Sequence, residues 1–261
     1  MNKKITIVAS VLLSTLLLTA CSSQSSTSST SSKSTLKVSQ SSTSSQSSSS
    51  TASSSETSSE KGEYTIDYFA QLAAKSKSVD ETYVVDDLVV GQGKDIEPGI
   101  YDLEVTGGSG SISIDREISD FYGSSWSLSA KGTDSNYPSV VRVILMEGDK
   151  IEFSSISKIK LTAVKTAKAS TELGEGNYVV GRDIEAGTYK LSTNISLDDE
   201  FSDLGWTIDT SNLNTEDSRS QELTPNNADV AIKLEEGEVL TTSLSLSYGD
   251  DNAKLIFTKL N

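Results

Sequence analysis

The side chains in this sequence that could do chemistry are mainly carboxylates, because the chain contains no histidine and a single cysteine, Cys21. Without histidine, a Ser-His-Asp triad, a histidine-ligated zinc site and imidazole acid–base catalysis are excluded. A pair of carboxylates could still hydrolyse a glycosidic bond. The densest acidic stretch contains Asp198, Asp199, Glu200 and Asp203. We interpret it as a solvated loop, with a weak calcium site as the alternative, since no calcium-loop or phosphate-loop consensus is present.

Four aromatic residues are candidate ligand contacts, because exposed aromatic rings can stack on sugars: Trp126, Trp206, Tyr101 and Tyr189. Tryptophan between the strands of a small β-domain is more often a core residue, and we favour that interpretation. No residue is assigned to catalysis, to a metal or to a cofactor. The sequence therefore predicts a protein that is not an enzyme.

One seven-residue phrase occurs twice, as DIEPGIY from Asp95 and as DIEAGTY from Asp183. In each copy a second matching stretch follows, VRVILMEGDKIEF in the first and VAIKLEEGEVLTT in the second. The matches keep their order and nearly their spacing, which is typical of an internal duplication. We therefore predict two β-domain repeats, 81–168 and 171–261.

The repeated phrase is interpreted as a structural turn that leads into a strand. Gly99 follows a proline, and this pair suits the centre of a type II turn, where glycine takes the positive φ; Gly187 keeps that glycine. Asp95 and Asp183 can accept hydrogen bonds from nearby backbone amides and so tighten the loop. A ligand or cation site is the alternative.

Strands are indicated by apolar residues at every second position, as at Tyr101, Leu103 and Val105. Gly148 and Gly237 each interrupt two apolar runs, as a tight hairpin turn does. Many short strands separated by turn residues predict an all-β fold, made of two tandem antiparallel β-sandwich or jelly-roll-like repeats.

A targeting signal occupies residues 1–20, with two lysines before fourteen mostly apolar residues that are too few to cross a bilayer. It ends in Leu18-Thr19-Ala20-Cys21, which resembles the lipobox of bacterial lipoprotein precursors. The resemblance implies cleavage before Cys21, a diacylglyceryl thioether on its sulfur, and anchoring to the extracytoplasmic face of the cell membrane. A simple secretory signal with an incidental cysteine is the alternative.

A serine-rich tether follows over 21–62, in which 23 of the 39 residues from 22 to 60 are serine. Such a composition has too little apolar surface to offset the entropy of ordering, so we expect disorder. As a flexible coil its ends would lie roughly 35 Å apart. It would lift the folded part away from the membrane.

A short helix is predicted within 63–80, before the first repeat. Thr65 can cap its first turn, and Ile66, Phe69 and Leu72 recur at helical spacing. We expect two to three turns that pack on the first repeat, with a partner-binding helix as the alternative.

The net charge of −15 argues against nucleic acid and anionic headgroups as partners, because both are negatively charged. Both repeats also fit the pattern G-x-D-I-x-x-G-x-Y, which resembles segments of surface lipoproteins and secreted proteins of Gram-positive bacteria. That resemblance implies no activity.

The partners that we expect are the membrane, through the lipid anchor, and a cell-wall glycan or a surface protein. The sequence thus favours a non-catalytic binding module of the cell envelope. The alternatives are a carboxylate-dependent hydrolase of wall polymers and a structural spacer or surface-exclusion factor.

Overall fold

The computed structural model describes residues 64–116, 124–134, 136–245 and 251–261. The chain divides into two compact units, Met1–Glu56 and Thr57–Asn261, and all described residues belong to the second. The signal peptide, the lipidation site Cys21 and the serine-rich tether lie outside the described residues, and they remain predictions.

Strands account for 52% of the structure and helices for 7%, so the predicted all-β fold is confirmed. The first group of strands, called the N-terminal segment below, consists of β1 (Val79–Tyr83), β2 (Leu88–Val89), β3 (Gly99–Asp115), β4 (Ser125–Ser129), β5 (Val140–Leu145) and β6 (Lys150–Ala163). The second group, called the C-terminal segment, consists of β7 (Glu172–Leu173), β8 (Gly176–Val179), β9 (Gly187–Thr193), β10 (Trp206–Asn212), β11 (Asp217–Leu223), β12 (Ala231–Leu234), β13 (Val239–Leu244) and β14 (Leu255–Lys259). A short 3₁₀ helix, η1 (Asp199–Phe201), precedes β10.

The predicted helix is confirmed as α1 (Ile66–Lys75). Thr65 is its N-cap, and the threonine side chain accepts a hydrogen bond from the backbone N–H of Tyr68. The cap satisfies one of the amides that the first turn leaves without an intrahelical partner. Phe69 and Leu72 are buried, so the apolar stripe faces the strands as its spacing predicts.

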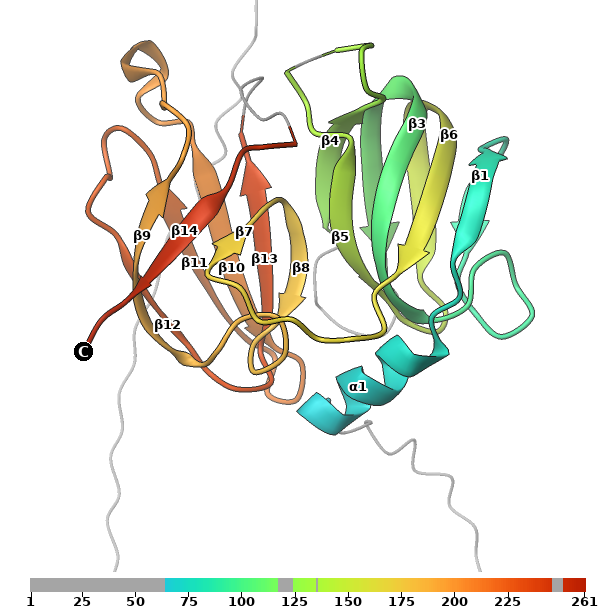
Figure 1. Cartoon of the computed structure of the whole chain (residues 1–261), viewed down its shortest axis with the longest axis horizontal. Helices are drawn as coiled ribbons and strands as arrows, with labels where there is room; N and C mark the ends of the chain where they lie inside the picture. Colours follow the sequence, from blue (N-terminus) through green and yellow to red (C-terminus); the bar gives the residue numbers. More distant parts are fainter. Residues whose placement is uncertain (1–63, 117–123, 135, 246–250) are drawn as a thin grey trace, which may run out of the picture. The chain divides into compact units, whose positions relative to one another are not determined.

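The strands form two sheets (Figure 1). In the larger sheet, β1-β6-β3-β5-β8-β13-β10-β11 lie side by side, with β2 also paired to β6 and β4 to β3. The smaller sheet has the order β12-β9-β14-β7 and belongs to the C-terminal segment. The larger sheet therefore crosses the boundary that the sequence predicts between the two repeats.

The two segments join where β5 and β8 pair in parallel, at Arg142 opposite Gly176. The backbone N–H of Arg142 donates to the carbonyl of Glu175 across this seam, at 3.3 Å. Gly176 has φ +137°, and a Cβ there would overlap the backbone carbonyl oxygen of Arg142. Only glycine combines that dihedral angle with so close an approach of two backbones.

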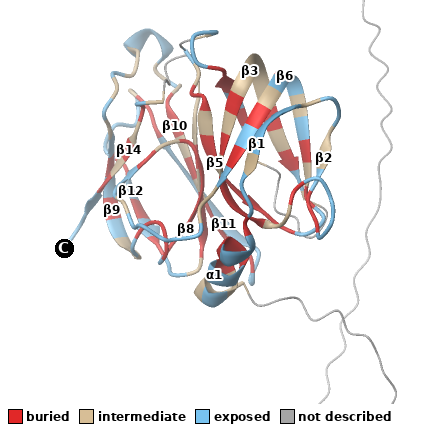
Figure 2. Ribbon diagram, turned by 45° about the vertical axis from the view of Figure 1, so that its right-hand side comes forward, coloured by how far each residue is buried: buried red, intermediate tan, exposed pale blue. Residues whose placement is uncertain are grey.

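Three hydrophobic clusters hold the fold together, and buried positions lie on the strand faces that meet them (Figure 2). One lies within the N-terminal segment, and a second takes side chains from both sheets of the C-terminal segment. The third lies under α1 and joins Phe69 to Ile100 and Ile144 of the N-terminal segment and to Val179 and Val239 of the C-terminal segment. The helix thus packs on both segments, whereas the sequence predicts contact with the first repeat alone.

The two aspartates of the repeated phrase make the same backbone contact. Asp95 accepts from the N–H of Val89 at 3.0 Å, and Asp183 accepts from the N–H of Val179 at 2.9 Å. Both close the loop in the manner that the sequence predicts. Their surroundings differ, because Asp95 is exposed while Asp183 is buried.

The predicted type II turn is wrong at both glycines. Gly99 does not have a positive φ, and Gly187 has φ +157°, whereas the turn requires about +80°. Gly99 is needed for space instead, since a Cβ there would overlap the hydroxyl oxygen of Ser76, which accepts a hydrogen bond from the N–H of Ile100. The sequence indicates that glycine is required at this position. It does not show whether the reason is a positive φ or the lack of space for a Cβ.

Gly148 and Gly237 do form turns, with φ +90° and +86°, but these turns do not close hairpins. β5 and β6, on either side of Gly148, both pair with β3 and not with each other. β12 and β13, on either side of Gly237, belong to different sheets. Alternation and a turn glycine predict two strands and a reversal between them, but they do not identify the partner of each strand.

The contrast between Asp183 and Asp95 yields a prediction about stability. Asp183 binds the guanidinium of buried Arg182 at 2.5 Å, so Asp183→Asn leaves a buried cation without its counter-ion and should destabilise the fold by about 3–5 kcal/mol. Asp95→Asn keeps the backbone contact in an exposed loop and should cost at most about 1 kcal/mol. Urea denaturation of both variants measures the difference. Equal losses would contradict this account.

Candidate functional site

The four aromatic candidates for ligand contact are buried. The exposed fractions are 2% for Trp126, 1% for Trp206, 0% for Tyr101 and 1% for Tyr189. None of these rings offers a face to a sugar, so the proposed stacking role is wrong and the core role that we favoured holds. The two tyrosine hydroxyls donate to the carbonyls of the residues four positions earlier, at 2.8 and 2.9 Å.

The two tryptophans serve different contacts. The indole N–H of Trp126 donates to the backbone carbonyl of Thr242 at 3.1 Å, across the junction into β13. The indole N–H of Trp206 donates to the hydroxyl of Thr193 at 3.0 Å, within the C-terminal segment. Both polar atoms are satisfied, which allows the rings to be buried without loss.

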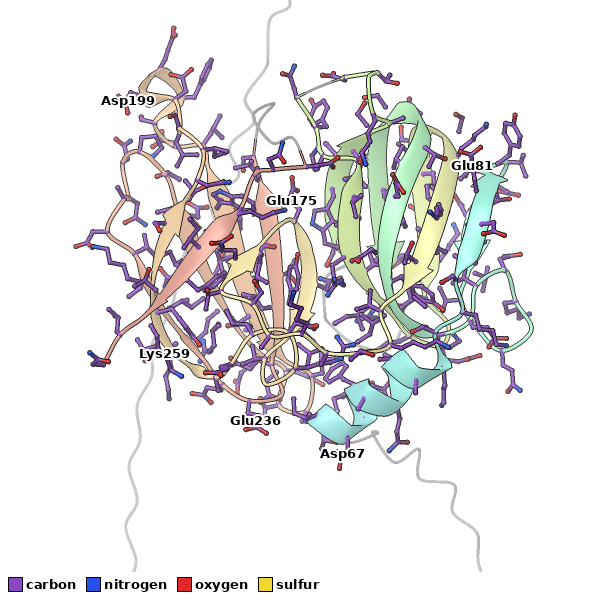
Figure 3. All side chains as sticks on the ribbon, in the orientation of Figure 1. Asp67, Glu81, Glu175, Asp199, Glu236 and Lys259 are labelled. Atoms are coloured by element: carbon purple, nitrogen blue, oxygen red, sulfur yellow. The ribbon has the colours of Figure 1, made fainter. Side chains whose placement is uncertain are left out.

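The acidic loop around η1 is held by hydrogen bonds of its own side chains and of Asn226. Asp198 caps the short helix by accepting from the N–H of Glu200 at 2.8 Å, and Asp203 accepts from the amide of Asn226 at 2.8 Å. Asp199 is exposed at the edge of the molecule (Figure 3). Within the described part of the chain, no group of three or more His, Cys, Asp or Glu residues could hold a metal ion.

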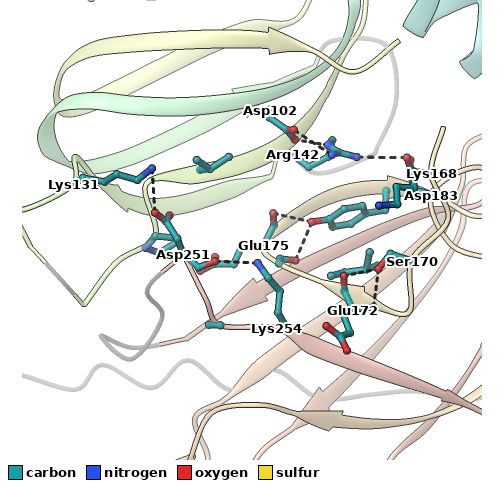
Figure 4. Close-up of a pocket in the computed structure, with 16 residues that line it drawn as sticks. Asp102, Lys131, Arg142, Lys168, Ser170, Glu172, Glu175, Asp183, Asp251 and Lys254 are labelled. Atoms are coloured by element: carbon teal, nitrogen blue, oxygen red, sulfur yellow. Dashed lines mark hydrogen bonds and ion pairs between the residues drawn. The ribbon is translucent and has the colours of Figure 1, made fainter. Parts of the chain in front are cut away.

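A pocket at the junction of the two segments is the strongest candidate site (Figure 4). It has a volume of about 400 Å³ and takes its walls from both segments, on either side of the β5–β8 seam. Most of its polar side chains are charged. The acids are Asp102, Glu172, Glu175, Asp183 and Asp251, and the bases are Lys131, Arg142, Lys168 and Lys254. The volume and the location at a junction agree with small-ligand sites, but the charged lining differs from the mainly apolar lining that such sites usually have.

Arg142 is the central cation of one wall, and it is fully occupied by the protein. Its guanidinium contacts Asp102 at 2.5 Å and Asp183 at 3.5 Å, so it joins a residue of β3 to a residue of the second repeated phrase. It also lies over the ring of Tyr178, 5.5 Å from the ring centre. Such a network fixes the wall in position and leaves Arg142 little capacity for a ligand.

The opposite wall is organised by Asp251. Its carboxylate accepts from the hydroxyl and the backbone N–H of Ser139, at 2.9 and 2.6 Å, and lies 3.7 Å from the ammonium of Lys131. Its backbone carbonyl accepts from the ammonium of Lys254 at 3.0 Å. Asp251 thus ties together residues from both segments around the pocket.

Glu175 is buried like Asp183, but it lies in the seam itself and, among the described residues, forms no ion pair of the kind that Asp183 forms with Arg142 and Arg182 (Figure 3). Its exposed fraction is 9%. Burial raises the pKa of its carboxyl to about 7, and the backbone N–H of Leu244 opposes that rise only in part. A carboxyl with this pKa changes its charge near neutral pH.

Sequence reasoning missed the pocket and both of its central residues. The only local signal was an acid between two glycines, Gly174-Glu175-Gly176, in a region that otherwise reads as a short strand. Arg142 alternates with apolar neighbours as an ordinary exposed strand residue does. Arg142 and Glu175 line the pocket because β5 and β8 pair across the seam. The periodicity of residues within one repeat does not reveal that pairing.

Comparison of the chain with models of protein families, with curated proteins and with solved structures finds no match. Among the residues that the structure describes, no helix is long and apolar enough to cross a membrane.

The carboxyl of Glu175 predicts a pH-dependent stability. Because its pKa is raised from 4.5 to about 7 in the folded state, the folded state binds more protons than the unfolded state between these pH values. The free energy of unfolding should therefore fall by on the order of 3 kcal/mol as pH rises from 4.5 through about 7. Glu175→Gln cannot lose a proton at this position, so its free energy of unfolding should not show this fall. The difference in free energy of unfolding between Glu175→Gln and the unsubstituted chain should therefore shift in favour of the variant from pH 5 to pH 8.

Urea denaturation at the two pH values measures this effect. Glu172→Gln is the matched control, since Glu172 lines the same pocket but is exposed. An unchanged pH dependence in Glu175→Gln would show that this carboxyl is not the group responsible.

Proposed function

We propose that the chain is a bacterial lipoprotein, anchored through Cys21 to the extracytoplasmic face of the cell membrane, and that its folded part is a non-catalytic binding module of the envelope. The anchor is supported by the basic start, the apolar run and the sequence Leu18-Thr19-Ala20-Cys21. The serine-rich tether would place the folded part at the level of wall polymers and surface proteins. The tandem repeats of the sequence form the scaffold in this proposal.

The junction pocket is the observation that supports binding. It lies between two segments, has the volume of a small-ligand site and presents charges of both signs. Two of its acids, Asp102 and Asp183, are held by Arg142, and Asp251 is held by Ser139. Carboxylates that are engaged in this way serve positioning better than nucleophilic attack.

A carboxylate-dependent hydrolase of wall polymers is the competing function. It is favoured by one observation, the pKa of about 7 for Glu175, because a glycosidase needs a carboxylic acid that stays protonated near neutral pH. Against it, the four aromatic candidates are buried and give no platform for a sugar chain. A spacer or surface-exclusion role would leave the pocket without a use.

The anchor is tested by labelling with radioactive palmitate in a Gram-positive host that produces the full chain. We expect label in the membrane fraction for the unsubstituted chain, and neither label nor membrane retention for Cys21→Ala, because the thioether requires the sulfur. Ser22→Ala is the control and should behave as the unsubstituted chain does. Equal membrane retention of Cys21→Ala would contradict lipid anchoring at this residue.

Binding is tested by co-sedimentation of the lipidated chain, in neutral detergent, with purified cell walls and with wall polysaccharide. We expect saturable binding that Lys168→Gln weakens by roughly tenfold through loss of one charge-assisted contact. Lys160→Gln, an exposed residue outside the pocket, is the charge-matched control and should bind normally. Release of reducing sugar by the unsubstituted chain, lost in Glu175→Gln, would instead support the hydrolase.

A further inference from the structure

Glu175 lines the junction pocket, and among the described residues its carboxylate pairs with no cation. Burial and the backbone N–H of Leu244 are what act on its carboxyl, and no lysine or arginine of the described chain lies within 4.0 Å of it. A buried carboxylate of this kind is costly unless something else provides the positive charge.

Two lysines of the same pocket have no carboxylate as an ion-pair partner among the described residues. Lys168 and Lys254 line it, and within the described chain neither has a carboxylate oxygen within 4.0 Å. The ammonium of Lys254 donates to a backbone carbonyl at 3.0 Å and lies next to Gly174, 3.2 Å from the position that a Cβ would take there. Lys131 and Arg142, by contrast, are each paired with two carboxylates.

Among the described residues, the pocket therefore holds two acids, Glu175 and the exposed Glu172, and two lysines that do not neutralise each other directly. A ligand with charges of both signs can bridge such groups, whereas an anion would meet Glu175 and a cation would meet the lysines. We propose that the junction pocket binds a small zwitterion, a free amino acid or a short peptide, with Glu175 contacting its ammonium group and Lys168 and Lys254 its carboxylate. This inference rests on the binding role proposed above and specifies its ligand class.

The volume and the surroundings of the pocket agree with such a ligand. About 400 Å³ lies in the range of small-molecule sites. The carbonyls of Gly174 and Glu175 accept from the hydroxyl of Tyr178, at 3.2 and 3.4 Å, which fixes the backbone on which Glu175 is mounted. The raised pKa of Glu175 is consistent with a carboxylate that lacks its counter-ion until the ligand supplies one.

The test uses isothermal titration calorimetry of the lipidated full chain in neutral detergent micelles at pH 8. Three probes separate the two charges: alanylalanine, which carries both, N-acetyl-alanylalanine, which lacks the ammonium group, and alanylalanine amide, which lacks the carboxylate. We expect alanylalanine to bind and each blocked probe to bind roughly tenfold or more weakly, because each loses one charge-assisted contact.

Two variants assign the charges to residues. Glu175→Gln should abolish the preference for the free ammonium group, so that alanylalanine and its N-acetyl form bind equally weakly. Lys254→Gln should abolish the preference for the free carboxylate. Asp199→Asn and Lys160→Gln remove an acid and a base outside the pocket, and both should keep the affinities of the unsubstituted chain.

The outcomes separate this inference from the proposed function. If the chain binds walls but none of the three probes at millimolar concentration, the zwitterion site is wrong while the envelope role stands. If alanylalanine binds with the same affinity to Glu175→Gln, the assignment of that carboxylate is wrong. If the probes bind as expected but walls do not, the site is supported and wall binding is wrong.

Discussion

The contact between Gly176 and Arg142 is the constraint on which the described structure depends. β5 and β8 come close enough to pair because position 176 has no side chain and adopts φ +137°. The approach makes one sheet out of strands from both segments. It also places Glu175 in the seam and Arg142 at the pocket wall, so the fold and the candidate site have the same origin. A Cβ at position 176 would affect both together.

Most of the buried charged side chains around that seam are paired with a charge of opposite sign. Arg142 is satisfied by Asp102 and Asp183, and Asp183 is also satisfied by Arg182 and by a backbone amide. Such networks are stable in a low dielectric because every member has a partner. Glu175 is a buried pocket residue that, within the described chain, departs from this rule, and burial raises the pKa of its carboxyl. The proposed binding role rests on this contrast between a paired framework and the pocket groups that have no ion pair within the described chain.

The sequence predicts those features that depend on local pattern. The cap at Thr65, the stripe of α1, the strands and the loop-closing aspartates all follow from residues within a few positions of each other. The features that it misses depend on distant partners. Gly99 is required by Ser76 and not by a turn angle, Gly148 and Gly237 reverse the chain without closing hairpins, and Trp126 donates across the junction. Asp95 and Asp183 are equivalent in sequence, yet only the second is buried, because the seam passes beside one copy of the phrase alone.

The start of the described chain has a mechanical consequence for an anchored protein. Tyr64, directly before α1, is clamped through its backbone by the side-chain amide of Asn214, with bonds of 2.8 and 3.0 Å. Asn214 belongs to the connection between β10 and β11, far along the chain. If the chain is anchored as proposed, a pull on the residues before Tyr64 would act on the C-terminal segment through Asn214 as well as on α1. In the proposed lipoprotein, the force would then be shared between the two segments that α1 joins.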